Sequence, residues 1–388
     1  MLRARLLPLM AGLALAGCAG GDTGDLPPQL QEEIGDENAP AARLAFSSTA
    51  TSNTTRLGGS DVAADAAGVA SALFPATSPS SRPNAVVLVN RDDWQGGIAA
   101  GVLTGTPIGA PILISDEEDL PAVSEETLAR LKPPGSDLAR DAQVIRIGER
   151  VATPENLRSA VISGNGPFET AAAIDRFSTT AQGEPSEDVL VVSAERPEWA
   201  MPAGAWAARS GDSVLYARRD SLPEPTRRAI ALHSRPDIFV LGPEPVIGAG
   251  VERELRKLGR VRRIEARTPV ENAIAFARFE SRGFGWGLTV PGNNFTVAST
   301  ARALDGAASA ALGSNGVFAP LLLIDNPAIL PLALENYFLD VQPGYEDDPN
   351  EGVFNRVWIL GDESAVSLQV QGRLDEVAEL VPVEVNEP

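Results

Sequence analysis

A buried strand, a loop with an aromatic residue and a helix of small residues follow one another three times along this chain. The three passes are residues 85–90, 91–94 and 98–103, then 189–193, 195–199 and 203–208, then 287–290, 292–295 and 298–303. Trp94, Trp199 and Phe295 occupy corresponding places in these passes, 105 and 96 residues apart. Because a repeat of this length is one structural unit, the chain is limited to folds built from three similar units.

Each pass continues with a second apolar strand, a helix start marked by proline, and a last strand that ends in glycine. These elements are residues 110–114, 213–216 and 320–324, then Pro121, Pro223 and Pro331, then residues 144–148, 238–242 and 357–361. Short apolar strands that alternate with helices predict an α/β fold with mostly parallel sheets flanked by helices. Residues 380–385 resemble residues 261–264, which open the third pass, so neighbouring units are candidates for sharing strands.

The order of these elements resembles the cell wall-binding repeat type 2 family of surface proteins, which usually carries three tandem copies. Residues 164–171 match the opening of the family repeat best, and residues 55–61 open the first pass in the same manner. Residues 292–295 match the family's later loop, and residues 110–114 match its P-I-L-L strand. The resemblance covers residues 54–385 and implies a pseudo-threefold arrangement and non-covalent binding of an anionic cell-wall polymer.

The chain departs from the family at its charged positions. The arginine of the family's opening motif and the aspartate after its loop aromatic are both expected to be missing. Their places fall at Val62, Pro167 and Pro269 for the arginine, and at Gly96, Met201 and Val297 for the aspartate. The net charge is −20, from 32 Lys+Arg and 52 Asp+Glu, which opposes non-specific contact with polyanions. Fold does not carry function with it, so these departures weaken the implied polymer binding.

The N-terminus has the layout of a secretory signal peptide. Arg3 and Arg5 precede an apolar run over residues 6–15, which is shorter than the ~20 residues of a membrane-spanning helix. The run ends in Leu-Ala-Gly-Cys18, which resembles the bacterial lipobox. We therefore expect a signal peptide over residues 1–17 and a lipid on Cys18 that holds the protein to a membrane on its extracytoplasmic side. The alternative is an ordinary signal peptide with a chance cysteine.

Residues 18–53 are acidic and contain two adjacent prolines, so they predict a flexible tether between the lipid and the body. The alternative is that residues 44–46 pack on the body. Three repeat units follow, with expected boundaries at residues 54–158, 159–260 and 261–388.

Signals of catalysis are weak. The single histidine, His233, lies near the end of a predicted helix, where a capping or surface role is expected, and no Gly-x-Ser-x-Gly motif occurs. Cys18 is the only cysteine, so zinc ligands are too few and no internal disulfide can form. Calcium is conceivable at Asp92 and Asp93 or at residues 346–348. We expect no catalytic residue, no metal and no cofactor.

The loops that follow the strands are the best candidates for ligand binding, because ligands of parallel sheets sit at the carboxyl ends of strands. An aromatic ring beside hydrogen-bonding groups suits the face of a sugar. The candidate residues are Arg91, Asp93, Trp94, Arg196, Trp199, Asn293, Asn294 and Phe295. The alternative is that the aromatic residues pack inward and only fix the loops. A basic run at residues 253–263 is interpreted as a solvated helix face, because glutamates interleave it.

These patterns favour a non-catalytic cell-surface lipoprotein that binds a cell-wall polymer or an envelope protein, and not nucleic acid. A solute-binding lipoprotein of a transporter is the alternative, although three equivalent passes do not suit two lobes. An envelope hydrolase is a further alternative that lacks a recognisable nucleophile or metal set.

Overall fold

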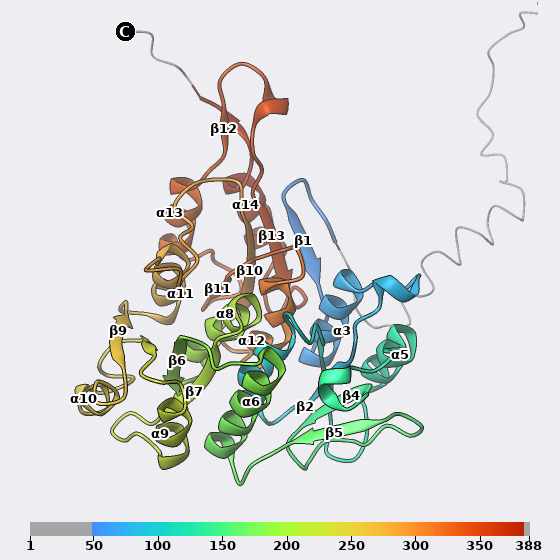
Figure 1. Cartoon of the computed structure of the whole chain (residues 1–388). Helices are drawn as coiled ribbons and strands as arrows, with labels where there is room; N and C mark the ends of the chain where they lie inside the picture. Colours follow the sequence, from blue (N-terminus) through green and yellow to red (C-terminus); the bar gives the residue numbers. More distant parts are fainter. Residues whose placement is uncertain (1–48, 384–388) are drawn as a thin grey trace, which may run out of the picture. The chain divides into compact units, whose positions relative to one another are not determined.

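The three passes build three four-stranded sheets in which all the strand pairs are parallel (Figure 1). The computed structural model describes residues 49–383. The strand orders are β3-β2-β4-β5, β7-β6-β8-β9 and β11-β10-β13-β1. The strands are β1 (Thr54–Leu57), β2 (Val86–Asn90), β3 (Ile112–Ser115), β4 (Val144–Ile147), β5 (Ser159–Ile162), β6 (Asp188–Ser193), β7 (Ser213–Ala217), β8 (Asp237–Leu241), β9 (Arg260–Ile264), β10 (Asn294–Ser299), β11 (Leu321–Ile324) and β13 (Arg356–Leu360).

Helices connect most of the successive strands, which confirms the predicted α/β fold. The α-helices are α3 (Val62–Leu73), α4 (Trp94–Ala99), α5 (Ala122–Leu131), α6 (Pro167–Gln182), α7 (Pro197–Ala200), α8 (Pro202–Ser210), α9 (Glu224–Ala231), α10 (Ala249–Leu255), α11 (Pro269–Arg278), α12 (Asp305–Ala308), α13 (Leu332–Asp340) and α14 (Leu368–Val377). The 3₁₀ turns are η1 (Pro79–Ser81), η2 (Ala100–Leu103), η3 (Asp137–Ala139), η4 (Ala310–Gly313) and η5 (Pro349–Glu351). Within residues 49–383, no helix combines the length and the apolar character needed to span a bilayer.

The predicted strand and turn signals have clear physical counterparts. Strands β2, β3, β7 and β8 are buried at every position, as expected of strands covered on both faces. The glycine after the last strand of each unit has a positive φ, +85° at Gly148, +108° at Gly242 and +88° at Gly361. Left-handed backbone favours glycine, which explains why each last strand ends in this residue.

The predicted position of the first strand in the third pass was wrong. Its first buried strand is β10, so Phe295 lies inside a strand, and residues 287–290 are not a strand. Gly283, Gly285 and Gly287 all have positive φ and form a turn before the chain reaches β10. The helix expected at residues 298–303 is replaced by the end of β10 and a turn, and α12 begins at residue 305. Because these glycine turns precede β10, the strand begins later in the sequence than the apolar residues 287–290 suggested.

Each sheet takes its fourth strand from the next unit along the chain. Strand β5 joins β4, β9 joins β8, and β1 from the start of the body joins β13 near its end. Figure 1 shows this closure as the blue β1 beside the red β13. The cyclic exchange agrees with the pseudo-threefold arrangement that the family resemblance implies.

The interpretation of residues 380–385 as an opening strand of the main sheets was wrong for its described part. Strand β14 (Val381–Pro382) pairs with β12 (Gly344–Tyr345) in a separate two-stranded sheet. The corresponding edge of the third sheet is already occupied by β1.

A buried arginine holds β1 in the third sheet. Arg56 is 2% exposed, and its guanidinium donates to the Gln371 side-chain oxygen at 3.0 Å, the Gly361 carbonyl at 2.8 Å and the Val366 carbonyl at 2.7 Å. Burial lowers the pKa of Arg56. Just before β1, the backbone N–H of Asn53 donates to Asp375 of α14 at 2.7 Å. The first residues of the described chain are therefore tied to its last helix.

The N-terminal predictions lie outside this part of the chain. The signal peptide, Cys18, residues 44–46 and most of the predicted tether precede the described residues.

Small residues let the three units meet closely. Helix α8 of the second unit packs against η2 of the first and η4 of the third. A Cβ added to Gly101 would lie 2.6 Å from the Gly204 carbonyl oxygen, and one added to Gly204 would lie 2.5 Å from the Gly306 carbonyl oxygen. Real Cβ atoms do not approach so closely, so side chains are excluded at these positions by the neighbouring backbones.

Replacing Gly204 with alanine is expected to lower the free energy of unfolding by about 1–3 kcal/mol, because the new methyl group must push two units apart. Chemical denaturation measures the change. Gly372→Ala in α14 is the matched control, since nothing lies within 4 Å of its added Cβ, and it should stabilise the protein by up to about 1 kcal/mol. Equal effects of the two substitutions would contradict this account of the centre.

Candidate functional site

A pocket of about 500 Å³ lies where the closing strand brings the first and third units together. It is surrounded by the loops that follow β1, β2, β10 and β13, all at the carboxyl ends of parallel strands. This is the edge at which ligands of such sheets bind. We call it the interunit pocket; its lining residues are Ser60, Asp61, Val62, Arg91, Asp92, Trp94, Ser299, Ala301, Arg302, Ala303, Leu304, Ser364 and Ala365.

The first unit supplies an aromatic ring and charged groups to this pocket. Trp94 is half-buried and packs edge-on against Tyr216, with 5.9 Å between ring centroids. The Arg91 guanidinium pairs with Asp116 at the surface. Asp92 is exposed and lines the pocket beside them. The Asp61 carboxylate caps α3 by accepting from the Ala64 N–H at 2.9 Å.

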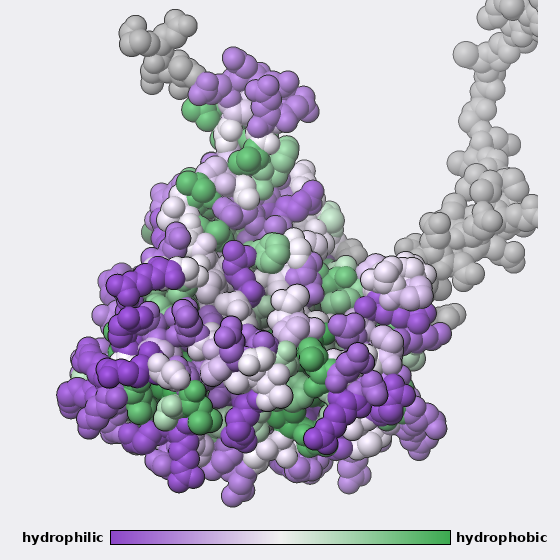
Figure 2. Space-filling model, in the orientation of Figure 1, coloured by the Kyte–Doolittle hydropathy of each residue, from purple (hydrophilic) through white to green (hydrophobic). Residues whose placement is uncertain are grey.

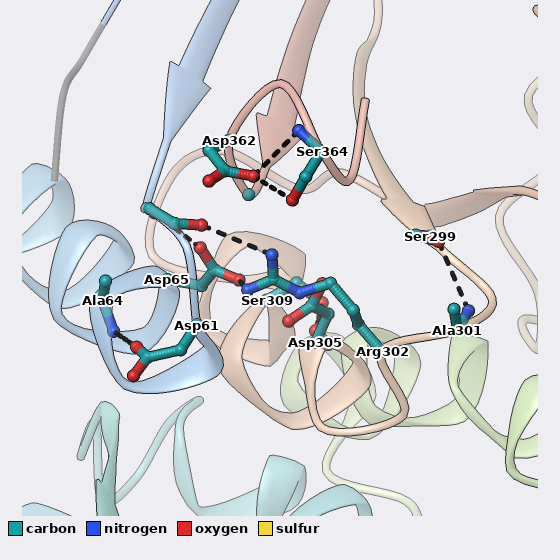
Figure 3. Close-up of polar contacts among 12 residues, drawn as sticks. Asp61, Ala64, Asp65, Ser299, Ala301, Arg302, Asp305, Ser309, Asp362 and Ser364 are labelled. Atoms are coloured by element: carbon teal, nitrogen blue, oxygen red, sulfur yellow. Dashed lines mark hydrogen bonds and ion pairs between the residues drawn. The ribbon is translucent and has the colours of Figure 1, made fainter. Parts of the chain in front are cut away.

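Beneath the pocket, one arginine faces two fully buried carboxylates (Figure 3). The Arg302 guanidinium donates to Asp65 of α3, and its Nε lies 3.3 Å from Asp305. A second oxygen of Asp65 accepts from the Gly59 N–H at 2.9 Å. If both carboxylates were ionised, one guanidinium would leave an excess negative charge among buried side chains.

Burial raises the pKa of both carboxyl groups. The pKa of Asp65 lies well above its usual range because of burial and the nearby charge of Asp305. Burial raises the pKa of Asp305 to about 6, although the charge of Arg302 opposes the shift. The pair therefore retains a proton at pH values where an exposed aspartate is ionised.

The structure corrects one of the expected departures from the family. Strand pairs Val87–Ile112 and Thr296–Leu321 have the same register, so residues of the third unit follow their first-unit counterparts by 209 positions (296 against 87, and 321 against 112). With this offset of 209 positions, Gly96 corresponds to Asp305 and not to Val297, which lies in β10. An aspartate therefore stands at this place in the third unit, and the residue at the place of Trp94 is Ala303 and not Phe295.

The predicted binding residues do not form one site. Arg91 and Trp94 line the interunit pocket, whereas Asp93 uses its carboxylate to cap α4 at the Gly96 N–H, 2.8 Å away. Burial raises the pKa of Asp93. Arg196 is exposed and pairs with Glu198 at 2.7 Å, away from the pocket.

The other predicted residues pack into the fold. Trp199 is 4% exposed and its ring lies against Gly242. Phe295 is fully buried against Phe338. The side-chain amides of Asn293 and Asn294 donate to backbone carbonyls, of Val290 at 2.7 Å and of Val317 at 2.9 Å. Inward packing thus describes Trp199 and Phe295, while Trp94 both packs and lines a pocket.

Sequence reasoning missed the residues that other units contribute to this pocket. Ser60 and Ser364 follow strands of the third sheet, and Arg302 lines the pocket while it pairs with the buried Asp305 of α12, three residues later. The i, i+3 spacing of Arg302 and Asp305 is a detectable signal of an ion pair. Their approach to Asp65, 237 positions earlier than Arg302, has no sequence signal.

The expectation of a capping or surface role for His233 was wrong. Its side chain is 1% exposed, with Nε2 2.8 Å from Asp175 Oδ1 and Nδ1 2.9 Å from the Ser186 carbonyl oxygen. Both partners can accept hydrogen bonds, so this pair of contacts favours the imidazolium, in which both ring nitrogens donate. Burial alone lowers the pKa of His233, but the hydrogen bond and charge of Asp175 bring it above the usual value.

This buried network does not have the geometry of a catalytic triad. The Ser213 hydroxyl donates to Asp175 at 2.6 Å and not to the histidine, so the imidazole does not activate the serine. Among residues 49–383, no three His, Cys, Asp or Glu side chains converge in a way that could hold a metal ion.

Half of the basic residues in the run 253–263 make ion pairs, and Arg260 does so with Asp237. Arg256 pairs with Glu252, and Arg263 pairs with the same glutamate at 2.7 Å. The face shown in Figure 2 is mostly hydrophilic, with only small hydrophobic areas. The run agrees with a solvated, ion-paired face better than with a polyanion-binding patch.

Comparisons with known proteins show the fold. No family model and no curated protein matches the sequence. The solved structure of Cwp8 from Clostridium difficile matches with a TM-score of 0.64 and 18% identity, over 90% of this chain and 54% of that protein. Cwp6 from Clostridium difficile matches with a TM-score of 0.65 and 17% identity, over 83% of this chain and 48% of that protein. This chain thus spans about half the length of these two proteins, and the likeness is one of fold.

The buried carboxylates predict a loss of stability as the pH rises. Because the folded pKa of Asp305 is raised to about 6, the folded protein binds a proton that the unfolded chain releases near pH 4. Stability should therefore fall as the pH rises from 4 to 7, by about 2 kcal/mol more in the wild type than in Asp305→Asn. Denaturant unfolding at both pH values checks this. Asp61→Asn, which keeps its cap, should follow the wild type.

The His233 pair also makes stability fall as the pH rises, because its pKa is raised in the folded state. A raised histidine pKa stabilises the fold fully below pH ~6.5, and this contribution is lost as the pH rises through the folded pKa. His233→Gln should cost about 3 kcal/mol at pH 6 and clearly less at pH 9. Arg228→Gln, which breaks an exposed pair with Glu224, should change stability by less than about 1 kcal/mol at either pH. A pH-independent effect of His233→Gln would argue against the imidazolium.

Proposed function

We propose that this chain is a non-catalytic cell-surface lipoprotein, anchored through Cys18, whose three-unit body binds a cell-wall polymer or an envelope protein. The observation that carries the proposal is the fold shared over 90% of the chain with the cell wall protein Cwp8. The lipobox-like N-terminus supports export and anchoring. The lipid, the ligand and the absence of catalysis are parts of the proposal.

The chemistry of the interunit pocket supports a polar, hydroxyl-rich ligand such as a sugar unit of a wall polymer. Its volume is in the range of small-molecule sites. The half-buried Trp94 ring can stack on the apolar face of a sugar, while Asp92 and Ser60 offer hydrogen-bonding groups. Arg302 is already paired with buried carboxylates, so the pocket does not offer a free cluster of cations to a polyanion.

The body does not support the transporter alternative. The body has three main sheets, and each sheet takes one strand from another unit. A solute-binding lipoprotein has instead two lobes with a hinge cleft. The hydrolase alternative lacks support at His233, which is engaged on both ring nitrogens.

Lipidation is tested with Cys18→Ala. The wild-type protein should partition into the detergent phase and take up labelled palmitate in its native host, and Cys18→Ala should do neither. Detergent partition of the variant equal to that of the wild type would remove the anchor from the proposal.

Wall binding is tested by sedimentation of the purified protein with sacculi of the source organism, with and without their attached polymer. We expect co-sedimentation of the wild type and about tenfold weaker binding for Trp94→Ala, because a central aromatic anchor is lost. Asp92→Ala leaves the packing of Trp94 unchanged and should also weaken binding, so that unfolding is separated from loss of a contact. Asp220→Ala, an exposed acid of the second unit, is the control. No sedimentation under any condition would leave an envelope protein as the partner.

A further inference from the structure

One backbone position has the same conformation in two units but a very different residue. In the first unit, the N–H of Gly109 donates to the carbonyl oxygen of Gly105, and the N–H of Ala110 donates to that of Leu103. In the third unit, the N–H of Phe318 donates to the carbonyl oxygen of Ser314, and the N–H of Ala319 donates to that of Leu312. Each of these residues lies 209 positions after its counterpart in the first unit. The φ is +65° at Gly109 and +57° at Phe318. Phe318 therefore stands where the first unit has a glycine.

Phenylalanine is an unfavourable choice for this position. Left-handed backbone is a genuine outlier for a bulky residue, and residues held in such conformations cluster at functional sites. Burial does not explain the choice, because Phe318 is 49% exposed. A large apolar ring is thus held at the surface in a conformation that glycine would adopt without strain.

The ring of Phe318 makes a cation–π contact with Arg209. The guanidinium carbon of Arg209 lies 5.2 Å from the centroid of the Phe318 ring and 5.3 Å from that of the Trp286 ring. Arg209 is exposed, in the last turn of α8, and makes no hydrogen bond or ion pair with any residue among 49–383. Two rings therefore hold the guanidinium by cation–π contact, while its N–H donors stay open to a ligand.

From this juxtaposition we propose that Arg209, Phe318 and Trp286 form a second binding site, distinct from the interunit pocket, for an acidic sugar. The sugar's carboxylate or phosphate accepts hydrogen bonds from the Arg209 guanidinium, and its apolar face stacks on the exposed side of Phe318. A planar guanidinium held in place matches the paired oxygens of either oxyanion. The site lies at the junction of the second and third units and rests on the proposed binding function.

The experiment is calorimetric titration of the full-length protein in detergent with three probes: trigalacturonate, glucose 6-phosphate and neutral maltotriose. We expect one or both acidic probes to bind and the neutral probe not to bind. Arg209→Gln and Phe318→Gly should each weaken binding about tenfold or more, as expected for loss of a charge-assisted hydrogen bond or of the stacking ring. Arg218→Gln, which removes a guanidinium over the single ring of Phe168, is the matched control and should bind as the wild type does.

Stability provides an independent readout. Phe318→Gly relieves the left-handed strain, so its thermal midpoint should equal or exceed that of the wild type even though its binding is lost. A lower midpoint would show that the fold needs the ring, and would overturn the argument from strain. Equal binding of maltotriose, no binding of either acidic probe, or unchanged binding by both variants would overturn the proposal.

The two proposals fail separately. If the wild type sediments with sacculi and Arg209→Gln does so equally, wall binding stands and this site does not. If the acidic probes bind through Arg209 and Phe318 while no sacculus binding occurs, the site stands and the wall-binding function does not.

Discussion

The third sheet is complete only when the first strand of the body joins its last strand, and much of the structure depends on this closure. Arg56 secures β1 with hydrogen bonds to Gln371 and to two carbonyls that follow β13. The same closure brings α3 over the third unit, so that Asp65 meets Arg302 and the loops around the interunit pocket converge. Without β1 in the third sheet, the interunit pocket would lose one side. Arg56, which lies on β1, would lose its hydrogen-bond acceptors.

Close backbone contact at the centre is the second requirement. The units meet through Gly101, Gly204 and Gly306, where a neighbouring carbonyl or backbone carbon excludes any side chain. Such contact leaves little room for independent movement of the units, because interiors packed to this density do not deform continuously. The carboxyl ends of the strands are therefore held in constant relation, which suits a binding surface better than a hinged cleft.

Charge is used differently in the interior and at the surface. Inside, Asp65 and Asp305 share one guanidinium, and His233 pairs with Asp175, so that buried charges meet partners but make stability depend on pH. At the surface, the basic run of the second unit is partly ion-paired, with Glu252 and Asp237. Arg209 differs from both, because its partners are aromatic rings and not carboxylates.

The sequence by itself determined the fold class, the number of units and the glycine that ends each last strand, because apolar periodicity and left-handed turns are local properties. It placed Trp94 near the carboxyl end of a strand, and the structure has this residue there, at the start of α4. It misplaced the first strand of the third unit, because the effect of three glycine turns on strand position outweighed a short apolar run. Only the tertiary structure decided that β1 completes the third sheet, that Asp65 meets Arg302, and that Phe318 frames Arg209. These contacts join residues about 100 or more positions apart, and no local pattern reports the geometry that brings such residues together.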